Sequence, residues 1–398
     1  MCSRHRATRP YLKTAIVALS FVGVLLFGVL SSRAGRADER YLDFVHKLQE
    51  QGLPDLAMEY LKLLQQRQDV PAEIKEKLDF ELGRTLIMQS EESDAETERQ
   101  LLDEAAKTLS KFLDEHNDSE NANDALAELA GVRLKQGQQV LAKAEGEKDA
   151  AKKAQLRADA RKTLEQAKQS LQTAVAKYRD ELGRGDPQSS PAKSETAKPE
   201  TKTKPDTKTK TKPTPKSTTA RKPQTKAKAA QKQVEKDPRV EAAFIIARLN
   251  LAIAEFFVGR TYDASIEAEK KTRTDQLNKA AQSFDDLFQE YRGVFPGHVA
   301  HLWHGRSLEE QGDLRQAIMI YDEVLVNEPP KGERLPKDQA ALFVQAEVFR
   351  LSILNKQQKF TEVIEEAQPW LNGNQDKRRT PHGLGIQLEL AKANIGQG

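Results

Sequence analysis

The sequence is poor in cysteine, in aromatic residues and in long apolar runs. Of its 398 residues only one is cysteine, Cys2, and 6% are aromatic. A single cysteine excludes an internal disulfide framework, a zinc site built from several cysteines and, at this position, a cysteine nucleophile. A mean hydropathy of −0.70 with 31% charged residues argues against one large conventional core. We therefore expect an extended architecture.

Residues 1–37 have the pattern of an export signal. Four basic residues and no acidic one precede the apolar run at 15–30, and small residues follow it up to Ala37. The 16 residues of that run make about 24 Å of helix, shorter than the roughly 30 Å core of a bilayer. This favours a cleaved signal peptide, with cleavage after Ala37, over a single-pass anchor, which stays open.

Either interpretation of residues 1–37 places the rest of the chain outside the cytoplasm, in the periplasm or cell envelope, because a basic flank stays inside. No other stretch is expected to approach membrane-spanning length.

Residues 184–236 are predicted to be a disordered basic linker. Lys, Thr and Pro alternate there, and residues 191–236 hold 14 Lys or Arg against four Asp or Glu. Without this stretch and residues 1–37, the chain has a net charge of −13. The linker is interpreted as a solvated spacer, or else as a tether to an anionic polymer or lipid surface. Nucleic acid is disfavoured because no aromatic residue lies among the lysines.

The sequence on both sides of the linker predicts helices. Apolar residues recur at three- and four-residue steps, and no alternating β-branched pattern occurs. In residues 298–331 one helix is expected to end at Gly312, and a second to run to about Asn327 before Pro329. This window resembles the tetratricopeptide repeat through residues with its signature spacing: Gly305, Leu308, Gly312, Ala317, Tyr321 and Pro329.

The resemblance implies an all-α fold, an α-solenoid of helical hairpins in two blocks, residues 38–183 and 237–398. Weaker copies carry similar second-helix positions, at residues 57, 61 and 64; 105, 109 and 112; 167, 171 and 174; 280, 284 and 287; and 363, 367 and 370. The linker either interrupts one solenoid or separates two. Near Gly259 two repeat registers fit, one with Ala264 and Ala268 and one with Ala280 and Phe284 in the second helix. The helix from Ile386 either caps the stack or begins a further unit of a longer chain. The copy at 71–117 is expected to carry about ten extra polar residues between its helices.

No pattern for catalysis, a metal or a cofactor is found. His298, His301 and His304 lie three residues apart, but successive steps of about 100° per residue turn them away from one common ion. Packing and groove lining are the favoured roles for these imidazoles. We expect no enzyme activity, no metal and no cofactor.

The resemblance also implies a protein or peptide ligand on the inner face of the solenoid. The positions that match the family's groove residues are His46, Phe80, Arg84, Leu302, Arg306, Glu309, Val348, Ser352 and Asn355. The function expected is that of an exported, noncatalytic adaptor or assembly scaffold of the cell envelope. The alternatives are a wall- or membrane-surface tether that acts through the linker, and a regulatory N-terminal region of a larger protein.

Overall fold

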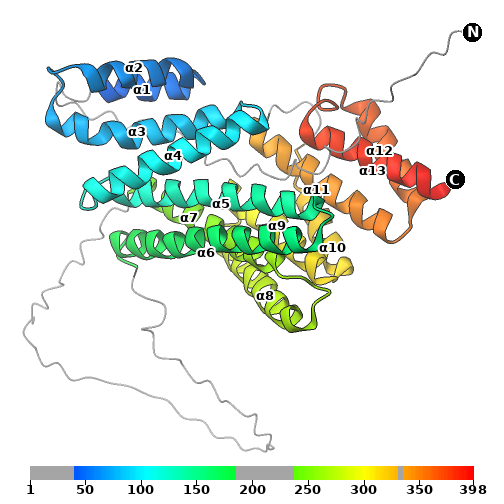
Figure 1. Cartoon of the computed structure of the whole chain (residues 1–398). Helices are drawn as coiled ribbons and strands as arrows, with labels where there is room; N and C mark the ends of the chain where they lie inside the picture. Colours follow the sequence, from blue (N-terminus) through cyan, green and yellow to red (C-terminus); the bar gives the residue numbers. More distant parts are fainter. Residues whose placement is uncertain (1–39, 185–236, 330–334) are drawn as a thin grey trace, which may run out of the picture.

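The fold is all-α, as the sequence predicts. The computed structural model describes residues 40–184, 237–329 and 335–398, and across these ranges it holds thirteen helices and no strand. The predicted export signal and the predicted linker from residue 185 onward lie outside the described residues. Figure 1 shows the helices following one another from one end of the molecule to the other.

The helices form consecutive antiparallel pairs, and a last helix follows the sixth pair. Their bounds are α1 Arg40–Glu50, α2 Pro54–Gln66, α3 Ala72–Glu91, α4 Ala95–Glu115, α5 Ala122–Gly146, α6 Ala150–Glu181, α7 Pro238–Thr261, α8 Glu267–Glu290, α9 Phe295–Gln311, α10 Leu314–Val326, α11 Lys337–Lys356, α12 Phe360–Gly373 and α13 Pro381–Gln397.

The pairs stack as a solenoid. Each helix packs on the next in sequence, and each odd-numbered helix also contacts the next odd-numbered one, from α1 through α13. The odd-numbered helices therefore form one continuous layer. Because α6 and α5 both pack on α7, the described helices on the two sides of the insertion belong to a single stack.

Helix α7 lies at the centre of this stack. It is the one described helix long and apolar enough to cross a membrane, contrary to the expectation from sequence, but 78% of its apolar stretch is buried inside the protein. It packs against α5, α6, α8 and α9. Since this helix is covered on nearly all sides, its apolar composition is that of a core helix.

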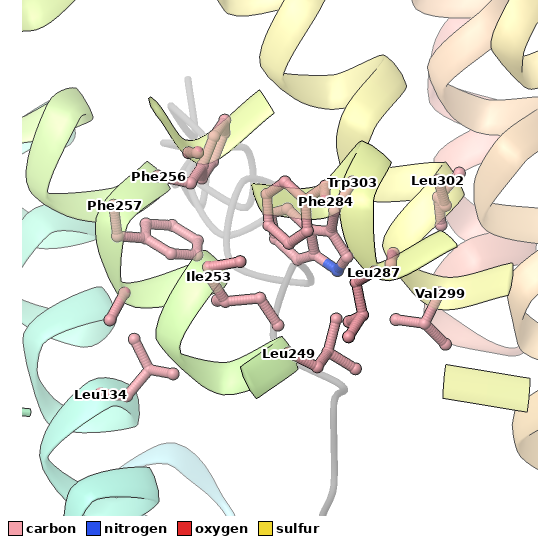
Figure 2. Close-up of a cluster of buried hydrophobic side chains, with 14 of the residues drawn as sticks. Leu134, Leu249, Ile253, Phe256, Phe257, Phe284, Leu287, Val299, Leu302 and Trp303 are labelled. Carbon is pink, nitrogen blue, oxygen red and sulfur yellow. The ribbon is translucent and has the colours of Figure 1, made fainter. Parts of the chain in front are cut away.

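Aromatic rings fill the core beside α7. Trp303 of α9 lies between phenylalanines of α7 and α8, with ring centroids 5.3 Å from Phe256, 5.7 Å from Phe257 and 6.2 Å from Phe284. Figure 2 shows these side chains together with leucines of the same cluster. Four aromatic rings are thus packed together where these three helices meet.

Glycine recurs where the two helices of a hairpin cross. In four successive hairpins a first-helix glycine faces a large second-helix side chain, at Gly83, Gly137, Gly259 and Gly305. A Cβ atom at Gly305 would lie 2.7 Å from the ring of Tyr321, and one at Gly83 would lie 2.6 Å from Leu109. These distances are too short for a side chain, so the close approach of the helices requires glycine.

The predicted ends of the two helices in this window are confirmed. Helix α9 ends at Gln311, and the next residue, Gly312, has φ of 90°, a conformation that favours glycine. Asp313 then caps α10 by accepting a hydrogen bond from the backbone N–H of Gln316. The second helix ends at Val326, next to the predicted Asn327.

The structure corrects one prediction made from the sequence and decides between two alternatives. The extra polar residues of the copy at 71–117 do not form a long loop, because α3 and α4 extend to leave only residues 92–94 between them. Near Gly259, Ala264 and Ala268 are exposed, whereas Ala280 and Phe284 are buried. The register that places Ala280 and Phe284 in the core is therefore the correct one.

We expect Gly305→Ala to destabilise the fold by about 1–3 kcal/mol, because the new methyl group must displace the buried ring of Tyr321. The matched control is Gly131→Ala in the middle of α5, where no atom lies within 4 Å of the new Cβ. There the better helix propensity of alanine should stabilise by roughly 0.5–1 kcal/mol. Urea unfolding followed by circular dichroism measures both; equal shifts would contradict the packing argument.

Candidate functional site

One groove lies along the odd-numbered layer at the N-terminal end of the stack. It has a volume of about 580 Å³ and is lined by residues of α1, α3 and α5, by the end of α6 and by the start of α7. We call it the α1–α7 groove. Its walls are the first helices α1, α3, α5 and α7, each of which contacts the next, and the end of α6.

Three of the predicted groove residues, His46, Phe80 and Arg84, line this groove. His46 Nε2 lies 3.1 Å from Oε1 of Glu81, and Arg84 Nη1 lies 3.6 Å from the same oxygen. The guanidinium of Arg84 also lies over the ring of Phe80, 5.6 Å from its centroid. The structure thus brings the three residues together: His46 and Arg84 contact one buried carboxylate, and Phe80 lies beneath Arg84.

Glu81 is charged although it is buried. Burial by itself would raise the pKa of its carboxyl, but the hydrogen bond to His46 and the charge of Arg84 outweigh burial, so the pKa is lowered. Gln49 adds a weak hydrogen bond of 3.5 Å and donates a second, of 2.9 Å, to Thr85. Glu81 therefore fixes the side chains of α1 and α3 that face the groove.

Glu128 of α5 is in the opposite situation. Its side chain is 12% exposed, and the nearest cationic atom, Nε of Arg84, lies 3.8 Å away. Burial raises the pKa of Glu128 to about 7, the charge of Arg84 opposes this, and the charges of Asp124 and Glu81 add to it. The positive charge near this carboxylate is therefore too small to offset its burial.

The lining as a whole has more carboxylates than cations. Six carboxylates line the groove, from Glu50, Glu120, Asp124, Glu128, Glu181 and Asp237, against the guanidiniums of Arg84 and Arg239 and the imidazole of His46. Arg239 is paired with Asp237 at 2.9 Å. Among the described residues, Glu50, Asp124 and Glu181 form no ion pair, although Asp124 accepts a hydrogen bond from the Tyr178 hydroxyl.

Amide side chains complete the lining. Asn121 and Asn123 lie on the same wall as Asp124. An amide can donate to and accept from a peptide backbone, while a carboxylate attracts an ammonium or guanidinium group. The groove therefore offers amides that can form hydrogen bonds with the main chain of an extended polypeptide, and carboxylates that can pair with its basic side chains.

The other six predicted groove residues lie on α9 and α11, away from this groove, and contact neighbouring helices. Leu302 is 1% exposed and belongs to the central core. Val348 packs against the core cluster shared with α13, and Ser352 is half-buried. The Asn355 amide donates to the backbone oxygen of Glu389, at 2.9 Å, and to its carboxylate, at 2.8 Å.

Arg306 and Glu309 take part in a buried charge network. Arg306 Nη1 lies 2.5 Å from Glu309 Oε2, and Lys356 of α11 donates to the other oxygen of that carboxylate at 2.6 Å. The hydroxyl of Tyr321 donates to Glu309 as well, at 3.0 Å. This network joins α9, α10 and α11, and a partner-binding role for its members stays a prediction.

The three spaced histidines do not converge. His301 stacks on Phe288 with ring centroids 3.8 Å apart, and its Nε2 lies 2.9 Å from Glu323. His304 turns toward Asp285, with 3.9 Å between Nδ1 and the carboxylate. In the described ranges no group of three His, Cys, Asp or Glu side chains is arranged to hold a metal ion.

Sequence reasoning missed the α5, α6 and α7 side of the groove. Asp124 and Glu128 are one helical turn apart and so share a face of α5, which could have indicated an acidic wall. The contributions of Glu181 and Asp237 could not be anticipated, because they depend on α6 and α7 meeting across the insertion.

The chain matches no protein-family model, and no curated protein matches its sequence. The resemblance to tetratricopeptide repeats thus stays a prediction that rests on the residues of the chain.

We expect Glu128→Gln to stabilise the protein at pH 8. As the pH rises from 4.5 to about 7, the unfolded chain releases the Glu128 proton before the folded one does, so folding loses stability over this window and does not regain it above. Glutamine does not titrate, so the variant should exceed the parent in free energy of unfolding by on the order of 1–3 kcal/mol at pH 8 and by nearly nothing at pH 4.

Thermal unfolding of both proteins at pH 4 and pH 8 measures this effect. Glu104→Gln, at an exposed position of α4, makes the same chemical change outside the groove and should alter neither midpoint. A Glu128→Gln protein no more stable than the parent at pH 8 would contradict the raised pKa.

Proposed function

We propose that this protein is a noncatalytic adaptor or assembly scaffold of the cell envelope, and that the α1–α7 groove binds an extended segment of a partner protein bearing Lys or Arg side chains. The envelope location rests on the export pattern of residues 1–37. The choice of a cationic ligand rests on one observation: carboxylates outnumber cations along an open groove lined by five helices.

Electrostatics supports a cationic ligand over an anionic one. Arg84 is already shared between Glu81 and Glu128, and Arg239 is paired with Asp237, so neither guanidinium is free for an anion. A ligand ammonium or guanidinium group near Asp124 and Glu128 would instead relieve their mutual repulsion.

A short synthetic peptide with Lys at alternate positions tests the groove. We expect it to bind the protein, with the affinity falling as salt is raised, and we expect the double change Asp124→Asn and Glu128→Gln to raise the Kd by about tenfold or more. Fluorescence anisotropy of the labelled peptide gives the Kd, and the same peptide with Glu in place of Lys should not bind.

The matched control separates the groove from the overall negative charge. Glu104→Gln with Asp114→Asn makes the same change of charge at two exposed positions of α4. It should leave the Kd within about twofold of the parent, because exposed charges at a distance are screened. Equal losses in the two double variants would refute the groove as the binding site.

Binding of the lysine peptide should strengthen from pH 6 to pH 8. Burial raises the pKa of Glu128 to about 7, so this side chain gains a negative charge over the interval, while Arg84, whose pKa is raised, stays positively charged. We expect the Kd to fall by about three- to tenfold. Glu128→Gln should reduce this pH dependence of the Kd, and an unchanged dependence in that variant would contradict the assignment to Glu128.

A further inference from the structure

The insertion between α6 and α7 leaves and re-enters the fold at the rim of the α1–α7 groove. Glu181, the last residue of α6, lines the groove, and so does Asp237, which caps α7. Arg184, the last described residue before the insertion, follows Glu181 by three residues and pairs with Glu241 in the first turn of α7. The positions from which residues 185–236 depart and to which they return are thus part of the groove or next to it.

Both ends are held in place by contacts. Arg184 Nη2 lies 2.5 Å from Glu241 of α7, and its Nη1 donates to the hydroxyl of Tyr291 at 2.8 Å. Asp237 accepts a hydrogen bond of 2.9 Å from the backbone N–H of Arg239. The two points of attachment are therefore fixed relative to the groove carboxylates.

The inserted sequence has the chemistry that the groove favours. Residues 191–236 carry 14 Lys or Arg against four Asp or Glu, and the basic residues alternate with Thr and Pro. Proline opposes helix and favours extended backbone, in which alternate side chains can face the same wall. Attachment at the rim gives such a segment an effective concentration of the order of millimolar at the groove.

We infer that residues 191–236 of this chain are the first ligand of the α1–α7 groove, with their lysines on the carboxylates of Glu50, Asp124, Glu128 and Glu181. A partner segment then binds by displacing them. This inference rests on the proposed function, because it takes over the ligand class assigned to the groove. It adds that the free protein carries a competitor for its own binding site.

Carbodiimide cross-linking of the full chain tests the placement. The reagent joins a lysine to a carboxylate only when the two are in direct contact, and mass spectrometry identifies the pairs. We expect links from lysines of 191–236 to the four groove carboxylates to exceed those to the exposed Glu267 and Glu362 by about fivefold or more, since the latter two do not line the groove. An even distribution over these carboxylates would overturn the inference.

Mixing heavy-isotope and ordinary chains before cross-linking distinguishes the chain's own segment from that of a second copy. Links within one chain join two peptides of the same isotope. Groove links that pair heavy with light peptides at the statistical frequency would assign the segment to another molecule and would also overturn the inference.

A second experiment alters only the inserted residues 191–236 and leaves the groove unchanged. Lys198, Lys202, Lys204, Lys208, Lys210 and Lys212 are replaced by Gln in the full chain, and the affinity for the labelled lysine peptide is measured. If the segment fills nine-tenths of the grooves, its loss should lower the Kd by about tenfold. The matched control replaces six exposed lysines of the helices: Lys62, Lys107, Lys162, Lys177, Lys271 and Lys337.

The outcomes separate this inference from the proposed function. If the peptide binds the parent and both variants alike, the groove binds cationic segments but the chain's own segment does not compete, and only the inference fails. If the peptide binds none of the three proteins and no groove links form, the ligand class of the groove fails as well. Tighter binding by the segment variant alone supports both.

Discussion

The close approach of two helices at a glycine is the contact on which the rest of the structure depends. At Gly83, Gly137, Gly259 and Gly305 the backbone of the first helix receives a large side chain of the second helix. Because hairpins of this geometry present a similar surface to their neighbours, they stack, and the odd-numbered helices come to stand in one layer. The groove is a consequence of this layer: its walls are the adjacent first helices.

The sequence predicted the fold better than it predicted the site. Second-helix positions such as Ala105 and Leu109 recur at a spacing that a single chain reveals, and they are fully buried. The polar stretch after α3 was misread because a charged helix extension and a polar loop have the same composition. Of the residues that line the groove, only His46, Phe80 and Arg84 were predicted, because they occupy first-helix positions that match the groove positions of the repeat.

What could not be predicted depends on contacts between distant segments. The raised pKa of Glu128 requires its burial beside Asp124 of its own helix and Glu81 of α3, and no local pattern reports burial of that kind. A buried carboxylate with too little positive charge around it lowers the stability of the fold above neutral pH. Perturbed carboxylates of this kind are common at binding sites, which supports the function proposed for the groove.

The two ends between which the chain is inserted, at α6 and α7, are held together by contacts among residues of the helical stack and Arg184. Arg184 is anchored on Glu241 and Tyr291, and α6 packs directly on α7. The entropy of closing a loop between fixed ends grows only with the logarithm of its length. The stack is therefore indifferent to what is placed there, and this junction is the point at which a reporter domain could be grafted into the chain without rearranging the helices on either side.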